Sequence, residues 1–98
     1  MSLKFEDFTK QQRNVIAEFV YSNETEILIK SDIRKLVEVF LDKNLIDNQH
    51  SEALNEKIEN NVPVVEELSE ILLTSIEENE GKKIMDEYFG RRSNAIDK

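Results

Sequence analysis

Apolar residues recur along this chain at the three- and four-residue spacing that is typical of helices packed against a core. In the first such segment, one arc of a helix holds Phe8, Val15, Ile16, Phe19 and Val20. The pattern predicts a helix over residues 4–21, which Ser22-Asn23 ends. Thr9 and Gln12 have the spacing of a capping box, which favours a later start as the alternative.

The second apolar segment has a regular helical period. Its inward positions are Ile33, Leu36, Val37, Phe40 and Leu41. Ser31 is the expected N-cap, and Asp32 in the first turn complements the helix dipole. Asn44 suits the left-handed position after the helix, and Leu45 supplies the apolar contact that follows it. Residues 24–30, just before this helix, fit either a short extended piece or its first turn.

Two further helices are predicted in the second half of the chain. Asp47 or Asn48 caps a weakly amphipathic, peripheral helix that ends near residue 60 and points Ala53, Leu54 and Ile58 inward. Pro63 suits the first position of a fourth helix, where its missing N–H costs nothing. This helix is expected to end near Asn79, with Gly81 as a stop. Its apolar face consists of Val64, Val65, Leu68, Ile71, Leu72 and Ile76.

A last, short helix is predicted over residues 82–89, with Gly90 as its C-cap. Its inward positions are Ile84, Met85, Tyr88 and Phe89. Residues 91–98 have little to bury, so a frayed tail is expected there.

These elements predict an all-α fold, a small irregular bundle of four to five helices with the second and fourth as the central pair. A chain of 98 residues is long enough for one core, which we place in a single domain over residues 1–90. The two glycines and one proline argue against an all-β fold rich in tight turns.

The charge of the chain is unevenly placed. The net charge is −8, and the segment 47–80 alone carries ten acidic residues against the single base Lys57. A nucleic-acid binder is expected to show a basic stripe, whereas this segment repels phosphate. Lys30, Arg34 and Lys35 place positive charge at the start of the second helix, and a helix-turn-helix would need that helix or the next one to contact DNA. The next helix is acidic and carries only Lys57, so we expect no direct nucleic-acid binding.

Several kinds of chemistry are excluded or disfavoured by residue type. Without cysteine and with His50 as its one histidine, the chain has no ligands for a thiolate zinc site or a two-imidazole site. Residues 42–47 begin like a calcium loop but lack its glycine and its final glutamate. No glycine-rich phosphate loop and no serine in a nucleophile elbow are present. We therefore expect no enzyme activity, no metal and no cofactor.

His50 and the pair of glutamates Glu66 and Glu67 have ordinary interpretations. His50 is expected to be a partly packed surface residue beside Leu54, and a pH switch is the alternative. The glutamates, with Glu70, are expected to lie on a solvated face. No apolar run is long enough to span a membrane, and the first residues do not resemble a signal peptide, so we expect a cytoplasmic protein that does not bind membranes.

One surface of the fourth predicted helix is a candidate for binding a partner. At 100° per residue, Glu66, Glu70, Leu73 and Glu77 share the side opposite the apolar face. An apolar residue within an acidic stripe has the composition of a binding hot spot with a charged rim. We therefore expect a small protein that binds and modulates another protein, such as one with a basic surface, as inhibitors, antitoxins, immunity proteins and assembly factors do. The alternatives are a mimic of DNA's charge and a self-associating structural subunit, for example a homodimer.

Overall fold

Five α-helices make up most of the part of the chain that the computed structural model describes, residues 2–27 and 29–96. The side chains are described up to residue 90. The elements in chain order are a short 3₁₀ helix η1 (Phe5–Asp7), α1 (Lys10–Glu24), α2 (Lys30–Asp42), α3 (Asn48–Glu59), α4 (Val65–Ser75) and α5 (Glu78–Ile96). The predicted fold class, a small all-α bundle, is confirmed.

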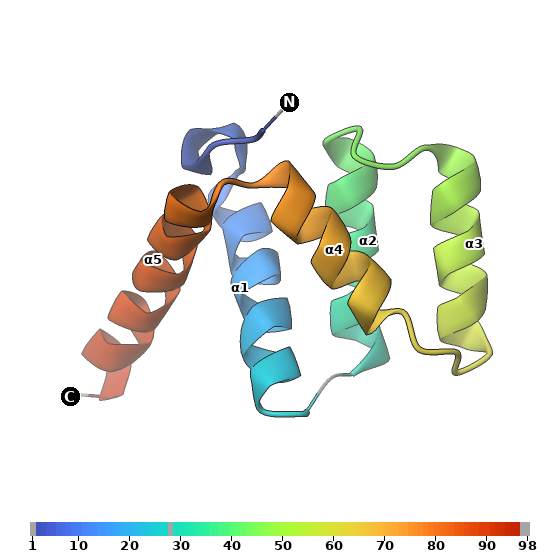
Figure 1. Ribbon diagram of the computed structural model, residues 1–98. Coiled ribbons are helices and arrows are strands. Elements are labelled where there is room, and N and C mark those ends of the chain that lie inside the picture. The colour runs from blue at the N-terminus through green and yellow to red at the C-terminus, as the bar shows by residue number, and fades with distance from the viewer. Residues whose placement is uncertain (1, 28, 97–98) are drawn as a thin grey trace.

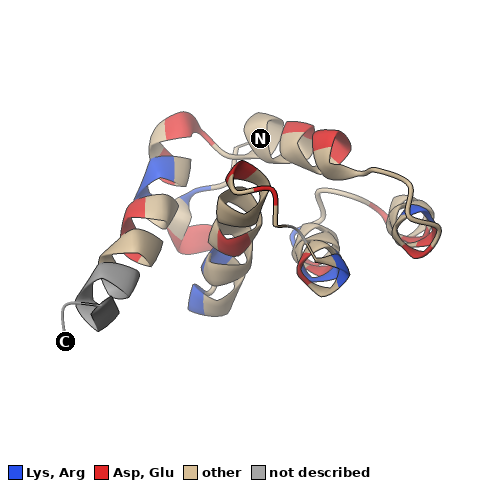
Figure 2. Ribbon diagram, turned by 90° about the horizontal axis from the view of Figure 1, so that it is seen from below, with Lys and Arg blue, Asp and Glu red and all other residues tan. Residues whose placement is uncertain are grey.

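The helices form two layers. α5, α1, α2 and α3 stand side by side in this order, and α4 crosses one face of the row (Figure 1). Seen from below, α4 covers the row from one side (Figure 2). α2 therefore lies between α1 and α3, whereas the sequence predicts a central pair of the second and fourth helices. α4 crosses over it instead of running beside it, because its apolar face covers several helices at once.

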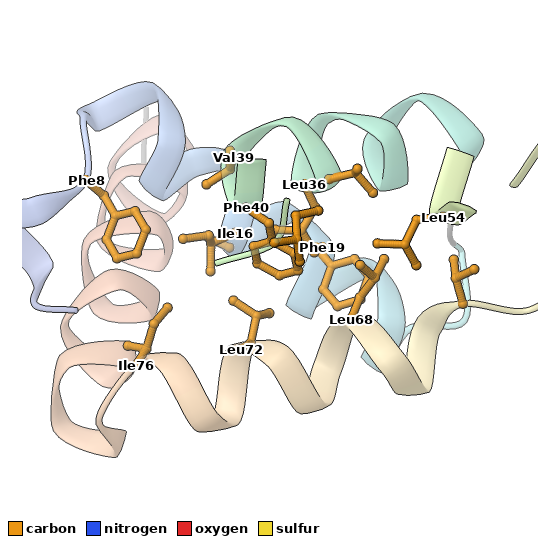
Figure 3. Close-up of a cluster of buried hydrophobic side chains, with 14 of the residues drawn as sticks. Phe8, Ile16, Phe19, Leu36, Val39, Phe40, Leu54, Leu68, Leu72 and Ile76 are labelled. Carbon is orange, nitrogen blue, oxygen red and sulfur yellow. The ribbon is translucent and has the colours of Figure 1, made fainter. Parts of the chain in front are cut away.

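The core fills the space between α4 and the row. Leu36 and Phe40 of α2 and Leu68 of α4 have no exposed surface, and Phe19 of α1 is 1% exposed. Figure 3 shows Leu68 and Leu72 pointing from α4 toward the side chains of α1 and α2. The predicted inward positions of α2 are therefore buried or half-buried. Val39 is buried as well, because α2 is flanked by a helix on each side and so buries a wider arc.

The start of α1 is set by its capping box. The backbone N–H of Gln12 donates to the Thr9 hydroxyl at 3.1 Å, and that of Thr9 donates to the Gln12 side chain at 2.9 Å. These two bonds satisfy donors that the first helical turn leaves unpaired. The predicted start at residue 4 is therefore wrong, and the later start is correct. The helix also continues past the predicted end at residue 21, to Glu24.

Three helices end in the same left-handed turn without a glycine. Glu26, Asn44 and Asn61 have φ values of 59°, 59° and 60°. In each case the next N–H bonds to a carbonyl five residues back, and the three bonds are Ile27 to Ser22, Leu45 to Phe40 and Val62 to Lys57. This is the Schellman closure predicted at Asn44 and Leu45. In the ambiguous segment 24–30, only Thr25 and Glu26 form this turn. Ile29 is extended and Lys30 begins α2, and Leu28 lies outside the described residues.

Glycine at position 26 is expected to stabilise the fold. Glu26 is exposed, and a glutamate has no local hydrogen bond that would favour the left-handed conformation as asparagine has. Glu26→Gly is expected to raise the free energy of unfolding by about 0.5–1 kcal/mol, measured by urea titration. Asn44→Gly is the matched comparison and is expected to gain less. A loss of stability in Glu26→Gly would contradict the left-handed turn.

The starts of α2 and α4 lie away from the predicted caps. The N-cap of α2 is Ile29, not Ser31, and the first bonds of the helix run from Asp32 and Ile33 back to the Ile29 carbonyl. Asp32 lies in the first turn, as expected. The N-cap of α4 is Val64, so Pro63 precedes the helix instead of opening it. Neither N-cap side chain accepts a hydrogen bond, which is why residue preferences for caps did not locate these starts.

α4 ends earlier than its periodicity predicts. Ile76 is extended, and its neighbour Ser75 accepts a hydrogen bond of 2.7 Å from the N–H of Leu3. Leu3 and Ile76 form an isolated parallel bridge. This pairing with the N-terminal segment ends α4 at Ser75, so the predicted end near Asn79 and the stop at Gly81 are wrong.

α5 is longer than predicted, because neither glycine interrupts it. It includes Gly81 and Gly90 and reaches Ile96, so the predicted bounds 82–89 and the C-cap at Gly90 are wrong. Ile84 and Tyr88 are buried as expected, whereas Phe89 is 42% exposed. Ala53 of α3, also predicted inward, is exposed. Fraying of residues 91–98 stays a prediction, and residues 97–98 lie outside the described part of the chain.

Glu80, at the start of α5, forms a hydrogen bond with η1. It is 8% exposed, and its carboxylate accepts the Phe5 N–H at 3.2 Å. Lys83 Nζ lies 3.3 Å from the same oxygen. The backbone hydrogen bond and the nearby Lys83 charge lower the pKa of Glu80. The carboxylate therefore stabilises the folded chain wherever it is ionised.

Stability is expected to depend on pH through Glu80. Because its pKa is lowered in the folded chain, its contribution is complete above the ordinary value of 4.5 and is lost as pH falls through the folded value. Glu80→Gln keeps an oxygen acceptor but removes the charge. The variant should be less stable than the wild type at pH 7, and the difference should vanish in acid. Urea titrations across pH measure it, and a difference that grows in acid would contradict the lowered pKa.

Candidate protein-binding surface

The outer face of α4 exposes a leucine that follows two exposed glutamates. Leu73 is 81% exposed, and its neighbour in sequence, Leu72, is 9% exposed. Glu70 is exposed about one helical turn before Leu73, and Glu66 about two turns before it. The 100° step between successive helical residues turns Leu72 into the core and Leu73 out to solvent. The predicted exposure of Leu73 is confirmed.

A groove of about 620 Å³ adjoins this leucine. It lies between α4 and the last turn of α1, and mainly apolar atoms line it. The lining residues are Asn23, Pro63, Val65, Glu66, Ser69, Glu70 and Leu73. Three of the four predicted binding residues, Glu66, Glu70 and Leu73, are therefore brought together. We call these seven residues the Leu73 surface.

Glu77 does not belong to the Leu73 surface. It is exposed in the connection between α4 and α5, two residues beyond the end of α4. Its predicted place in the acidic stripe assumed that the helix continues at 100° per residue through position 77. Because Ile76 is extended, the direction of the chain changes before Glu77, and this part of the predicted site is wrong.

Glu67 faces α3 and is separate from Glu66 and Glu70. Its Oε2 lies 2.6 Å from Nε2 of His50, and its Oε1 accepts a hydrogen bond of 3.3 Å from Lys57 Nζ. The hydrogen bond with His50 lowers the pKa of Glu67, and Lys57 adds to this effect. His50 is half-exposed and packed at the junction of α3 and α4, which agrees with its predicted surface position. The three glutamates therefore form no carboxylate pair suited to acid–base catalysis.

The acidic segment 47–80 is not one continuous acidic surface. Figure 2 shows its acidic residues distributed over α3, α4 and the start of α5. Several of these acidic residues pair with basic side chains of the same chain. Glu59 pairs with Arg34 of α2, Glu67 with His50 and Lys57, and Glu80 with Lys83. Glu66 and Glu70 are the two that line the groove beside Leu73.

The groove has lining residues that sequence analysis did not find. The apolar period predicts that Val65 lies on the core face of the fourth helix, and Pro63 is predicted as the first residue of that helix. Both line the groove, because α4 crosses the row of helices at an angle and leaves one flank of its first turn uncovered. Asn23 comes from α1, forty residues away from Pro63. No local pattern indicates that it lies beside α4.

The described part of the chain contains neither a candidate metal site nor a candidate membrane span. No group of three histidine, cysteine or acidic side chains there is arranged to hold a metal ion. None of the helices in those residues combines the length and apolarity needed to cross a membrane.

Comparison with models of protein families, with curated proteins and with solved structures finds no match to this chain.

Proposed function

We propose that this protein is a non-enzymatic binding module that recognises a basic surface of another protein through the Leu73 surface and thereby modulates that partner. One observation carries the proposal: Leu73 is 81% exposed beside a largely apolar groove that Glu66 and Glu70 flank. Inhibitors, antitoxins, immunity proteins and assembly factors act by such binding.

The physical argument joins an apolar anchor to a charged rim. Burying a leucine side chain against a partner gains about 1.5–3 kcal/mol. The groove beside Leu73 offers further apolar surface to the same partner. The carboxylates of Glu66 and Glu70 attract lysine and arginine and disfavour acidic partners, so they add specificity and speed the encounter.

Charge also favours a different protein over a second copy of this chain. A symmetric dimer formed through the Leu73 surface would bring Glu66 and Glu70 of both copies together, in a chain that already carries a net charge of −8. A DNA mimic needs acids spaced along one continuous face, whereas the acids here lie on several helices and some are paired within the chain. Binding to a basic protein partner is therefore the function that we propose.

Leu73→Ala is expected to weaken binding while leaving the fold intact. The change should alter the free energy of unfolding by no more than about 0.5 kcal/mol, since the side chain is exposed. The probe is a basic amphipathic peptide of about eleven residues, with leucines at helical spacing and lysines elsewhere. Its affinity, measured by fluorescence anisotropy, should fall about fivefold or more, which corresponds to about 1 kcal/mol. Unchanged affinity would contradict the proposal.

A matched pair of charge reversals separates this surface from acidity in general. Glu66→Lys with Glu70→Lys should weaken binding strongly. Glu52→Lys with Glu56→Lys makes the same change of net charge at the same helical spacing, on exposed positions of α3. This control should weaken binding much less. Equal losses of affinity from both pairs would mean that the peptide responds to net charge alone. Self-association without the peptide, measured by light scattering, would favour the alternative of a structural subunit.

A further inference from the structure

A second groove continues the first at the beginning of α4. It has a volume of about 180 Å³. It lies where α2, α3 and the connection from α3 to α4 meet. Its lining residues are Lys30, Ile33, Ile58, Asn61, Val62, Pro63, Val64 and Val65. Pro63 and Val65 line both grooves, so the two hollows adjoin.

We infer that the partner element is an amphipathic helix that lies along a strip from Leu73 through Val65 and Pro63 to Val62. This inference rests on the proposed function, because it names what occupies the Leu73 surface. The eight helical steps from Val65 to Leu73 span about 12 Å, and Val62 extends the strip beyond α4. An element that covers the strip therefore needs more than two helical turns.

The architecture of this face favours a helix over an extended peptide. An extended segment gains affinity by pairing its backbone with the edge of a sheet. In the described residues the one β-type pairing is the isolated bridge between Leu3 and Ile76, which lies at the opposite end of α4 from the shared groove residues. A helix satisfies its own backbone hydrogen bonds and presents apolar side chains at three- and four-residue spacing, which suits apolar hollows along α4.

The two ends of the strip differ in charge. Glu66 and Glu70 line the groove at the Leu73 end. At the Val62 end, the lining of the second groove includes Lys30 and no acidic residue. Val62 itself is 45% exposed. The partner helix is therefore expected to place its lysines and arginines over the Leu73 end and uncharged apolar residues over the Val62 end.

Peptide length tests the strip. The probes are the peptide of about eleven residues described above and an extension of it to about eighteen residues with uncharged apolar and glutamine positions. A third probe has the composition of the long peptide with its leucines scrambled. The long peptide should bind more tightly than the short one and than the scrambled one. Raising salt from about 0.1 M to about 1 M should weaken the short peptide but preserve the long peptide's relative gain, since the added contact is apolar.

Val62→Ser is the diagnostic variant. It should weaken the long peptide about threefold and leave the short one unchanged. Ile27→Ser is the matched control, because Ile27 is 69% exposed, follows the same kind of helix-ending turn and lines neither groove. It should change neither affinity. Val62→Thr, closer in shape, replaces Val62→Ser if thermal unfolding shows that the serine variant is damaged.

The outcomes distinguish the strip from the proposed function. If Leu73→Ala lowers the affinity for both peptides while both Val62 variants bind the long peptide normally, the inference of a helix along the strip is overturned. The proposed function then stands. A scrambled peptide that binds as tightly as the long one overturns the helical occupant. If Leu73→Ala affects neither peptide, the proposed function fails and the strip fails with it.

Discussion

Phe40→Ala is expected to lower the free energy of unfolding by about 3–5 kcal/mol, and Leu68→Ala by about 2–5 kcal/mol. Both side chains have no exposed surface and belong to the core between α4 and the row of helices (Figure 3). Removing either one loses its transfer free energy and leaves a cavity that close-packed neighbours fill only in part. A domain of this size has about 5–15 kcal/mol in total, so each variant should unfold at a much lower urea concentration.

α4 supplies a control for the leucine substitution within the same helix. Leu68→Ala and Leu73→Ala remove the same atoms five residues apart, from a side chain with no exposure and from one that is 81% exposed. We expect the first to reduce the urea midpoint strongly and the second to leave it nearly unchanged. Similar effects of the two substitutions would show that the faces of α4 are assigned wrongly.

Arg13→Ala is expected to lower the free energy of unfolding by about 2 kcal/mol. The Arg13 guanidinium donates to both carboxylate oxygens of Glu87 at 2.9 and 3.2 Å and to the Phe8 carbonyl at 2.7 Å. It also lies 4.2 Å from the centre of the Phe5 ring. The side chain is 14% exposed, and the Glu87 hydrogen bond raises the pKa of Arg13. One residue thus ties α1 to α5 and to the N-terminal segment.

Arg34→Ala provides the comparison for this prediction. Arg34 pairs with Glu59, but these side chains are 44% and 67% exposed. Exposed pairs contribute about 0–1 kcal/mol, because solvent and salt screen them. Thermal unfolding should therefore show a clear loss for Arg13→Ala and a small one for Arg34→Ala. Equal losses would mean that the network around Arg13 contributes no more than a surface ion pair.

Much of the fold could be predicted, because the apolar period of a helix is local. Spacing alone predicts five inward residues that are all buried, namely Leu36, Phe40, Leu54, Leu68 and Ile84. The turn at Asn44 was also predictable, since asparagine tolerates the left-handed conformation and Leu45 follows it. The matching turn at Glu26 carries no such signal in its residue type.

The ends of α4 and α5 could not be predicted, since contacts far apart in sequence set them. α4 stops where Leu3, more than seventy residues earlier, pairs with the chain at Ser75 and Ile76. Glycines suggested ends at Gly81 and Gly90, yet both lie inside α5. A glycine costs about 1 kcal/mol within a helix, and packing of Ile84 and Tyr88 against the core outweighs that cost.

For the candidate site, the sequence by itself determined that Leu73 and its flanking glutamates Glu66 and Glu70 share the outer side of one helix, because a fixed 100° step relates residues of the same helix. Only the tertiary structure decided what surrounds them. It placed Asn23 of α1 beside α4, turned Glu67 toward His50 and removed Glu77 from the stripe. The physical reason is that a groove forms between elements, and the crossing of α4 over its neighbours depends on how all their side chains pack together.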